Sequence, residues 1–211
     1  MENKKISAAV INRLPRYYRF LSDLLAEGVT RISSDELSRR MRTTASQIRQ
    51  DLNNFGGFGQ QGYGYNVENL KNEIGKLLGL NKSHEMVVIG AGNIGRALAG
   101  YSNFEEHGFH IAALFDIDDD LIGREIRGAE VMHVGTFEEF VRGHDVSIAI
   151  IAVPRDEAQR IAEMIYRCGI KAIWNFAHVD LILPDDVAVE NVHLSESLMK
   201  LSYGLNCIDN L

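Results

Sequence analysis

The stretch Met86-Val87-Val88-Ile89-Gly90-Ala91-Gly92-Asn93-Ile94-Gly95 places a G-x-G-x-x-G pattern directly after an apolar run. A second apolar run ends in Phe115-Asp116, about twenty residues after the last glycine. A strand, a glycine-rich turn, a helix and a second strand ending in an acid form the βαβ unit that binds dinucleotides. The sequence therefore predicts a dinucleotide site, and the alternative is a glycine turn without a ligand.

Each glycine of the pattern has an expected task. Gly90 permits the tight turn, Gly92 lets the backbone approach the pyrophosphate, and Gly95 allows close packing of the helix on the strand. The following helix, predicted over 94–101, points its first N–H groups at the phosphates.

The acids after the second strand bear on the choice of cofactor. We expect Asp116 to accept hydrogen bonds from both ribose hydroxyls of the adenosine half. Asp118, Asp119 and Asp120 crowd the same region, where a 2′-phosphate would meet like charge. NAD(H) is therefore favoured over NADP(H).

Strands and helices continue to alternate after Asp116. The sequence predicts strands over 131–134, 146–153 and 171–176, and helices over 136–142, capped by Thr136, and 156–168. The nearly all-apolar run at 146–153 is typical of a parallel strand buried on both faces. Ligands of such sheets lie at the carboxyl ends of strands, so Val153, Pro154 and Asn175 are further cofactor candidates.

The first sixty residues predict three short helices. Apolar residues recur at three- and four-residue intervals over 14–25, which makes one helix face. Capping boxes that begin at Ser33 and Thr44 start two more helices, joined by a turn at Arg42-Thr43. This arrangement is typical of a helix-turn-helix, and an ordinary three-helix bundle is the alternative.

The third helix, expected through about Asn53, has the residues of a DNA-reading helix. Ile48 and Leu52 should pack inward. Glutamine can pair with adenine, and arginine with guanine or phosphate. The side chains able to reach outward are Ser46, Gln47, Arg49 and Gln50.

Glycines alternate with aromatic residues over 55–65. A flexible linker is one interpretation. The four aromatic residues favour instead a β-hairpin with glycines in its turn, which would be a wing along the DNA backbone. A connecting helix is predicted over 67–80, and a domain boundary at 81–84.

Charge and composition point the same way. Residues 1–60 carry ten Lys/Arg and six Asp/Glu, whereas residues 61–211 carry twelve and twenty-three. A basic end on an acidic body is expected when one end meets a polyanion, although chance clustering would also produce it. The sequence shows no membrane span, no signal peptide and no metal-ligand spacing, and its two cysteines are unclustered, so a reducing cytoplasm is expected.

The last helix is predicted over 194–207, with leucines along one face that serve either as core or as a dimer contact. A dehydrogenase needs a positioned acid or base beside the nicotinamide. His178 and His193 are the candidates, and a structural role is favoured for both. We therefore expect no enzymatic activity.

The whole chain resembles the Rex family of redox-sensing transcriptional repressors. Unrelated dehydrogenases share only the glycines and the acid. The segments that carry the resemblance lie at 13–19, 48–52, 58–65, 90–95, 115–116, 153–154, 175–177 and 191–192.

The resemblance implies an α/β protein with a winged helix-turn-helix domain at 1–80, a Rossmann-like parallel-sheet NAD(H)-binding domain at 85–192, and a domain-swapped dimerisation helix at 193–211. It implies a homodimer that binds an inverted-repeat operator with NAD+ and releases it with NADH. One alternative is a small NAD-dependent oxidoreductase whose N-terminal domain dimerises. Another is a nucleotide-gated scaffold that binds protein partners through the last helix.

The motif positions give three sets of expected site residues. The cofactor set is Gly90, Ala91, Gly92, Asn93, Ile94, Gly95, Tyr101, Asp116, Val153, Pro154 and Asn175. The DNA set is Arg13, Arg16, Thr44, Ser46, Gln47, Arg49, Gln50, Gln60, Gln61 and Tyr63. The switch set, which should form the contact that differs between the two redox states, is Arg19, Tyr101 and His193.

Four positions depart from the family pattern. Gln60 and Gln61 stand where relatives often have basic residues, His178 where proline is common, and His193 where aspartate is common.

Overall fold

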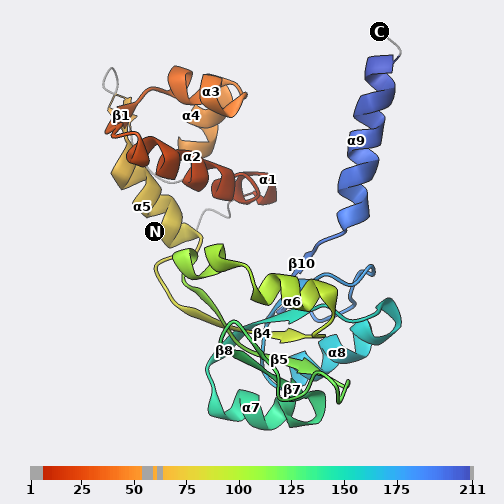
Figure 1. The fold of residues 1–211 in the computed structure, drawn as a ribbon. Coiled ribbons are helices and arrows are strands. Elements are labelled where there is room, and N and C mark those ends of the chain that lie inside the picture. The colour runs from red at the N-terminus through yellow and green to blue at the C-terminus, as the bar shows by residue number, and fades with distance from the viewer. Residues whose placement is uncertain (1–6, 54–58, 61–63, 210–211) are drawn as a thin grey trace. The chain divides into compact units, whose positions relative to one another are not determined.

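A computed structural model describes residues 7–53, 59–60 and 64–209. The chain divides into two compact units, an N-terminal unit (Met1–Lys82) and a C-terminal unit (Ser83–Leu211) (Figure 1). Each has its own hydrophobic core.

The N-terminal unit is helical with a small sheet. Its elements are α1 (Ala8–Ile11), α2 (Leu14–Ala26), β1 (Arg31–Ile32), α3 (Ser34–Met41), α4 (Ala45–Asn53), β2 (Gly59–Gln60), β3 (Gly64–Asn66) and α5 (Val67–Leu77). The strands pair antiparallel in the order β1-β3-β2. The predicted hairpin after the third helix is therefore confirmed, and with it the winged helix-turn-helix; α1 was not predicted.

Local chemistry sets the ends of these helices. Pro15 lies in the first turn of α2, where a missing N–H costs nothing. The hydroxyl of Ser33 caps α3 by accepting from the N–H of Glu36 at 3.1 Å. Arg42 ends α3 in the left-handed conformation with a φ of 49°, which makes the sharp turn into α4.

The core of the N-terminal unit joins all of its larger helices. Ile48 and Leu52 of α4 are fully buried, as predicted. The other fully buried apolar side chains include Leu21 and Leu24 of α2, Leu37 of α3, and Leu70 and Ile74 of α5.

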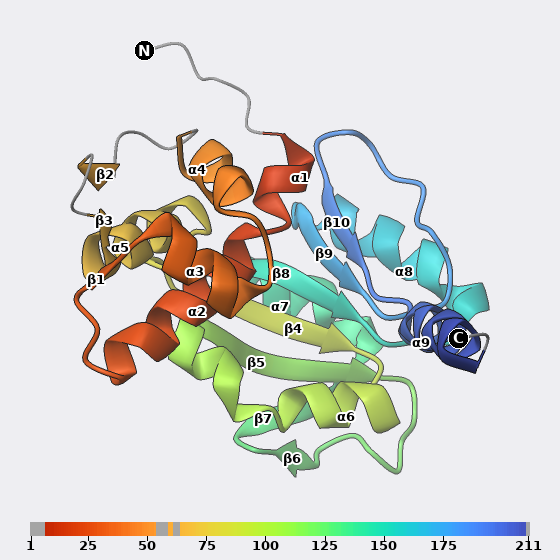
Figure 2. The ribbon, with the colours of Figure 1, turned by 90° about the horizontal axis from the view of Figure 1, so that it is seen from above.

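The C-terminal unit is a seven-stranded sheet with helices on both faces. Its elements are β4 (His84–Ile89), α6 (Asn93–Ala99), the 3₁₀ helix η1 (Ser102–His107), β5 (Phe109–Asp116), β6 (Glu125–Ile126), β7 (Ala129–His133), the 3₁₀ turn η2 (Val134–Thr136), α7 (Phe137–Gly143), β8 (Val146–Ile151), α8 (Arg155–Arg167), β9 (Ala172–Asn175), β10 (Ala188–Asn191) and α9 (Leu194–Asp209). The strand order is β10-β9-β8-β4-β5-β7-β6, with all pairs parallel except β6 and β7 (Figure 2). This is the predicted Rossmann-like parallel sheet.

Alternate residues of β4 face opposite sides of this sheet. Val87 and Ile89 pack with residues of α7 and α8, whereas Met86 and Val88 pack with residues of α6 and η1. A strand covered on both faces has to be apolar throughout, which is why β4 and β8 show no polar alternation.

Several details differ from the sequence predictions. Thr136 does not cap α7, because its hydroxyl donates to the carbonyl of His133 at 2.8 Å. The antiparallel strand β6 was missed, since two residues carry no periodicity. The helix predicted over 94–101 ends at Ala99, which leaves Tyr101 outside it.

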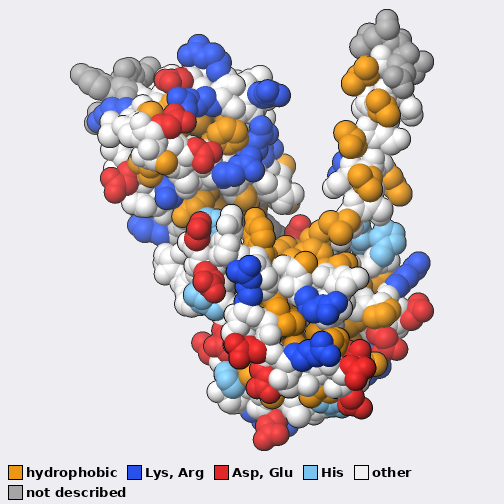
Figure 3. Space-filling model, viewed as in Figure 1, with side chains coloured by type: hydrophobic (Ala, Val, Ile, Leu, Met, Phe, Trp, Pro, Cys, Tyr) orange, Lys and Arg blue, Asp and Glu red, His pale blue; other side chains and the backbone are white. Residues whose placement is uncertain are grey.

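The last helix, α9, presents its apolar side chains to solvent (Figure 3). More than half of each of these side chains is exposed: Leu194, Leu198, Met199, Leu201, Tyr203, Leu205 and Ile208. Of the two roles left open for this face, a place in the core of the same chain is therefore wrong.

Within the described ranges, none of the helices is long and apolar enough to cross a membrane. Nor do the residues at 7–53, 59–60 and 64–209 include three or more His, Cys, Asp or Glu side chains placed to hold a metal ion. Cys168 and Cys207 are free thiols.

Candidate functional site

A crevice opens at the carboxyl ends of β4 and β8. These neighbouring strands form the switch point of the sheet, because the strands after β4 are first added on one side of it and, from β8 on, on the other. In sheets of this kind, ligands bind at that switch point. The crevice encloses about 480 Å³. Five of the predicted cofactor residues line it: Gly90, Gly92, Asp116, Val153 and Pro154.

The three glycines of the G-x-G-x-x-G pattern differ in what requires them. Gly90 has a φ of +101°, and a Cβ there would lie 2.5 Å from the carbonyl oxygen of Ala152. A Cβ on Gly95 would lie 1.9 Å from the carbonyl oxygen of Gly90. The fold itself therefore requires both of these glycines.

Gly92 has no such requirement from the chain. Its φ of −70° suits any residue, and a Cβ there would meet nothing within 4 Å. The space that a side chain would fill belongs to the crevice. A ligand whose phosphates approach the backbone at this point explains the glycine, so the residues present fit a dinucleotide.

The start of α6 supplies the groups that phosphates need. Gly92 is its N-cap and gives no side-chain cap, while Asn93 turns its side-chain oxygen to Arg96 at 3.0 Å. The first N–H groups of a helix have no partner within it and attract anions.

Asp116 organises the glycine loop in this structure. Its Oδ2 accepts from the N–H of Ala91 at 2.6 Å, and its Oδ1 accepts from the N–H groups of Ile117 at 2.7 Å and Asp118 at 3.1 Å. These bonds fix the carboxylate beside the crevice and leave Oδ2 able to accept one more hydrogen bond. The predicted contact with the ribose stays a prediction.

Two of the cofactor candidates lie elsewhere. Asn175 is fully buried, and its amide bonds to the carbonyl of Val179, the side chain of Asn191 and the N–H of Ala177. It shapes the loop after β9. Tyr101 lines a separate hollow of about 370 Å³ beside η1.

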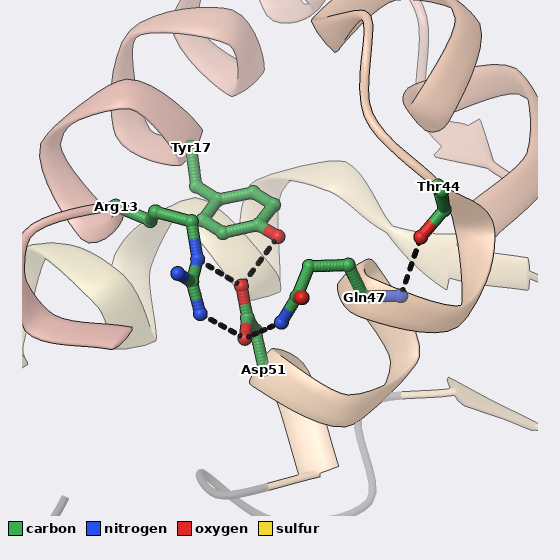
Figure 4. Close-up of polar contacts among 5 residues, drawn as sticks. All are labelled: Arg13, Tyr17, Thr44, Gln47 and Asp51. Carbon is green, nitrogen blue, oxygen red and sulfur yellow. Dashed lines mark hydrogen bonds and ion pairs between the residues drawn. The ribbon is translucent and has the colours of Figure 1, made fainter. Parts of the chain in front are cut away.

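The predicted DNA-reading helix α4 begins as expected but uses its polar side chains differently. Thr44 caps it by accepting from the N–H of Gln47 at 3.1 Å. The reciprocal bond of a capping box is not made, because the amide of Gln47 donates to Asp51 at 2.8 Å instead (Figure 4). Ser46 and Gln50 are exposed on the same helix.

Sequence reasoning missed the role of Asp51. This carboxylate is fully buried, and Arg13 donates to both of its oxygens at 2.7 Å. The hydroxyl of Tyr17 donates to it at 2.9 Å. The i, i+4 spacing between Gln47 and Asp51 could have indicated one of these contacts. Tyr17 and Arg13 are 34 and 38 residues away in the sequence, and no spacing rule connects them to Asp51.

Opposing effects set the pKa of Asp51. Burial raises the pKa. The hydrogen bonds from Arg13, Gln47 and Tyr17 and the charge of Arg13 together lower it by more than burial raises it, so the pKa lies below its usual value. Burial together with the bond to Asp51 raises the pKa of Tyr17. The carboxylate is therefore ionised and the phenol protonated at neutral pH.

The remaining DNA candidates are placed as follows. Arg49 donates to the hydroxyl of Ser34 at 2.9 Å and lies 3.8 Å from the carboxylate of Asp35. Arg16 donates to the carbonyl of Met41. Gln60 pairs with Gly64 in the wing through its strand register. Gln61 and Tyr63 lie outside the described residues.

The three switch candidates belong to different units. Arg19, exposed on α2, lies over the ring of Phe20 at 5.5 Å. His193 precedes α9, with its Nε2 3.4 Å from Asp180 and its ring 5.1 Å from that of His178. The contact among the three stays a prediction.

Two family models match the chain. Residues 81–179 match "CoA binding domain", and residues 5–53 match "Putative DNA-binding protein N-terminus". These ranges include the nucleotide crevice and the helix-turn-helix respectively.

Curated relatives cover nearly the whole chain. The "Redox-sensing transcriptional repressor Rex" of Thermoanaerobacter pseudethanolicus is 57% identical over 96% of this chain and 90% of the relative. The Rex of Clostridioides difficile is 54% identical over 95% of this chain and 96% of the relative.

Solved structures of one repressor agree over the same length. RSP in complex with β-NAD+ and operator DNA has a TM-score of 0.93 and 56% identity, covering 98% of this chain and 95% of that one. RSP in complex with β-NADH has a TM-score of 0.90 and 53% identity, covering 98% and 97%.

Proposed function

The chain belongs to the Rex family of redox-sensing transcriptional repressors, and from this premise we propose that it binds an inverted-repeat operator with NAD+ and releases it with NADH. The main observation in support of this proposal is Gly92. It is a glycine that the chain itself does not require, set in a crevice that suits a dinucleotide, on a polypeptide that also has a winged helix.

The residues divide the work of sensing. The N–H groups after Gly92 bind the pyrophosphate, and Asp116 holds the glycine loop through Ala91 while accepting from the ribose. NAD(H) supplies a nicotinamide ring that is cationic when oxidised and neutral when reduced. That difference can shift the protein between two arrangements only through unequal affinity for them.

The protein acts as a homodimer in this proposal, with α9 swapped onto its partner. The exposed apolar side chains along α9 support this, since a face of that kind is costly in water. Two winged helices related by a two-fold axis match two half-sites of an inverted repeat. Arg19, Tyr101 and His193 form the contact that distinguishes the arrangements.

The protein is a regulator, and we propose further that it is not an enzyme. The titratable side chains that line the described crevice are Asp116, Glu157 and Arg160. Backbone amides occupy the first, and the other two pair with each other at 2.6 Å. None of them is poised as a general acid or base. The function places the protein in the cytoplasm, where DNA and NAD(H) are both available.

A DNA titration tests the proposal. An inverted-repeat operator, selected from a randomised duplex pool, is titrated with protein at equal concentrations of NAD+ or NADH. We expect at least about tenfold weaker binding with NADH, within the usual range of coupling between sites. Equal affinity with both nucleotides contradicts the proposal, and steady hydride turnover with carbonyl substrates favours the oxidoreductase alternative.

A further inference from the structure

Four hydrogen bonds converge on the carboxylate of Asp51 inside the N-terminal unit (Figure 4). Arg13 and Tyr17 reach it from the α1–α2 region, and Gln47 reaches it along α4. Each oxygen of Asp51 accepts two bonds. The carboxylate is therefore saturated, and its position is fixed from two directions.

This arrangement determines which way the amide of Gln47 faces. An ionised carboxylate only accepts hydrogen bonds, so the nitrogen of the Gln47 amide must face Asp51, and its oxygen must face elsewhere. One hydrogen of the Gln47 amide is donated to Oδ1 of Asp51, with the nitrogen and oxygen 2.8 Å apart. The carbonyl oxygen and the second amide hydrogen make no other bond within the described part of the chain.

Gln47 also stands where a base reader is needed. It is the third residue of α4, and the first turn of a recognition helix is the part that meets base edges in the major groove. Its backbone N–H is satisfied by Thr44, so the side chain is not needed for capping. Gln47 is partly buried, and its side chain lies against Asp51.

We propose that Asp51 is a positioning residue that presets Gln47 to read an A·T pair, one in each half-site of the operator. This rests on the proposed function and assigns it one element of specificity. An acceptor and a donor on one amide edge match N6 and N7 of adenine. Because the side chain is ordered on folding, binding does not bear the entropic cost of fixing it.

A purely structural role accounts for less of what is observed. Arg13 already neutralises the charge of Asp51 with two bonds, and Tyr17 adds a third. The bond from Gln47 is not required to compensate the buried carboxylate. It does restrict an otherwise flexible side chain at the DNA-facing end of α4.

Selection from duplexes with randomised inverted half-sites tests the proposal on the full-length protein with NAD+. The variants are Gln47→Met, which keeps the volume without hydrogen bonds, Gln47→Asn, which keeps the amide without the reach, and Asp51→Asn. Tyr17→Phe is the matched control, since it removes one bond to Asp51 and leaves the bond from Gln47. Circular dichroism confirms that each variant is folded.

We expect the wild type to prefer adenine at one position by about 5- to 150-fold, the range of a bidentate contact. Gln47→Met, Gln47→Asn and Asp51→Asn each lose that preference at that position only, and Tyr17→Phe retains it. With 7-deaza-adenine at the position, wild-type binding weakens while Gln47→Met binding does not change.

Two results with the variants overturn this inference alone. Gln47→Met with an unchanged preference at every position shows that Gln47 does not read a base, and this variant decides the matter even if Asp51→Asn unfolds. A folded Asp51→Asn that keeps the preference while binding all sequences more weakly shows a structural role only. If the wild type binds its selected operator more tightly with NAD+ than with NADH, but the base preferences do not depend on Gln47, the proposed function stands and only this inference fails. A wild type that enriches no sequence removes both.

Discussion

The two units of this protein build their candidate sites from different materials. In the C-terminal unit the part of the crevice predicted to meet phosphates is backbone: the turn at Gly90, the open position at Gly92 and the N–H groups that follow. In the N-terminal unit the predicted DNA-reading helix α4 is held by side chains that converge on Asp51 from the α1–α2 region and from α4 itself. Backbone geometry leaves a signature in sequence spacing, whereas a side-chain network of this kind does not.

That difference predicts how each site fails. A site made of backbone tolerates changes except where an added atom meets the main chain or the ligand. A site made of buried polar side chains loses stability whenever one partner is removed, because the others remain buried and unpaired.

The largest effect is expected at Gly95. A methyl group there would lie 1.9 Å from the carbonyl oxygen of Gly90, and backbone cannot move aside cheaply. Gly95→Ala should lower the free energy of unfolding of the C-terminal unit by about 4 kcal/mol. Urea denaturation measures this. Gly143→Ala is the control, since a Cβ at Gly143 meets nothing within 4 Å. Equal stability of the two variants would mean that the glycine loop is looser than described.

Asp51→Ala should have the next largest effect, now on the N-terminal unit. It leaves Arg13, Tyr17 and Gln47 without their shared acceptor. Removing one member of a buried charged pair costs about 3 to 5 kcal/mol, and the lower end applies because the Arg13 side chain is 36% exposed and can be hydrated. Urea denaturation, followed by circular dichroism, measures it. Tyr17→Phe should cost about 1 kcal/mol. A neutral Asp51→Ala would remove the contrast between the units.

The sequence could predict most of the fold because both units follow local rules. Periodicity located α2, α5 and α8, and the capping residue Ser33 marked the start of α3. Apolar runs in the sequence predicted the parallel strands β4 and β8. Strands of two residues such as β6 could not be found, since their pairing partner, not their composition, makes them strands.

The sites were predictable to different depths for the same reason. The glycine spacing with its following acid located the crevice and three residues that line it, and the rule that ligands lie at strand ends located two more, Val153 and Pro154. Asn175 stands at a strand end, as Val153 and Pro154 do, yet tertiary contacts use both amide hydrogens and bond its oxygen to the N–H of Ala177. Likewise, the periodicity of α4 predicted an outward-facing Gln47, but the carboxylate of Asp51, one turn further along the helix, accepts a hydrogen bond from its amide.

Gly92→Ala separates ligand binding from stability within the backbone-made site. Because a Cβ there meets nothing in the chain, the free energy of unfolding should change by less than about 0.5 kcal/mol. The methyl group would occupy the space that we propose for the pyrophosphate, so affinity for NADH should fall about 30-fold, or about 2 kcal/mol. Fluorescence titration with NADH measures it. Unchanged affinity would place the nucleotide elsewhere.

Acidification should act on the side-chain network through Asp51. Its pKa is lowered in the folded state, so its stabilisation is present above the ordinary carboxyl pKa of about 3.9 and is lost as the pH falls further, through the folded value. The stability gap between wild type and Asp51→Asn should therefore be widest at neutral pH and narrow below about pH 4. Urea denaturation at a series of pH values measures the gap. A gap that is constant with pH would mean that Asp51 is not ionised in the folded protein.

The smallest effect is expected at Asp35, which lies 3.8 Å from Arg49 on the surface of the N-terminal unit. Both side chains are more than half exposed, at 53% and 75%, so water screens the pair and Asp35→Asn should change stability by less than about 0.5 kcal/mol. Operator affinity should nevertheless rise about two- to threefold at low salt, because a negative charge leaves the neighbourhood of Arg49, which keeps its bond to the hydroxyl of Ser34 and attracts phosphate more strongly. The gain should vanish as salt screens it. Binding titrations at two ionic strengths test this. An affinity that falls would show that Asp35 orients Arg49, which would extend to the surface the side-chain dependence predicted at Asp51.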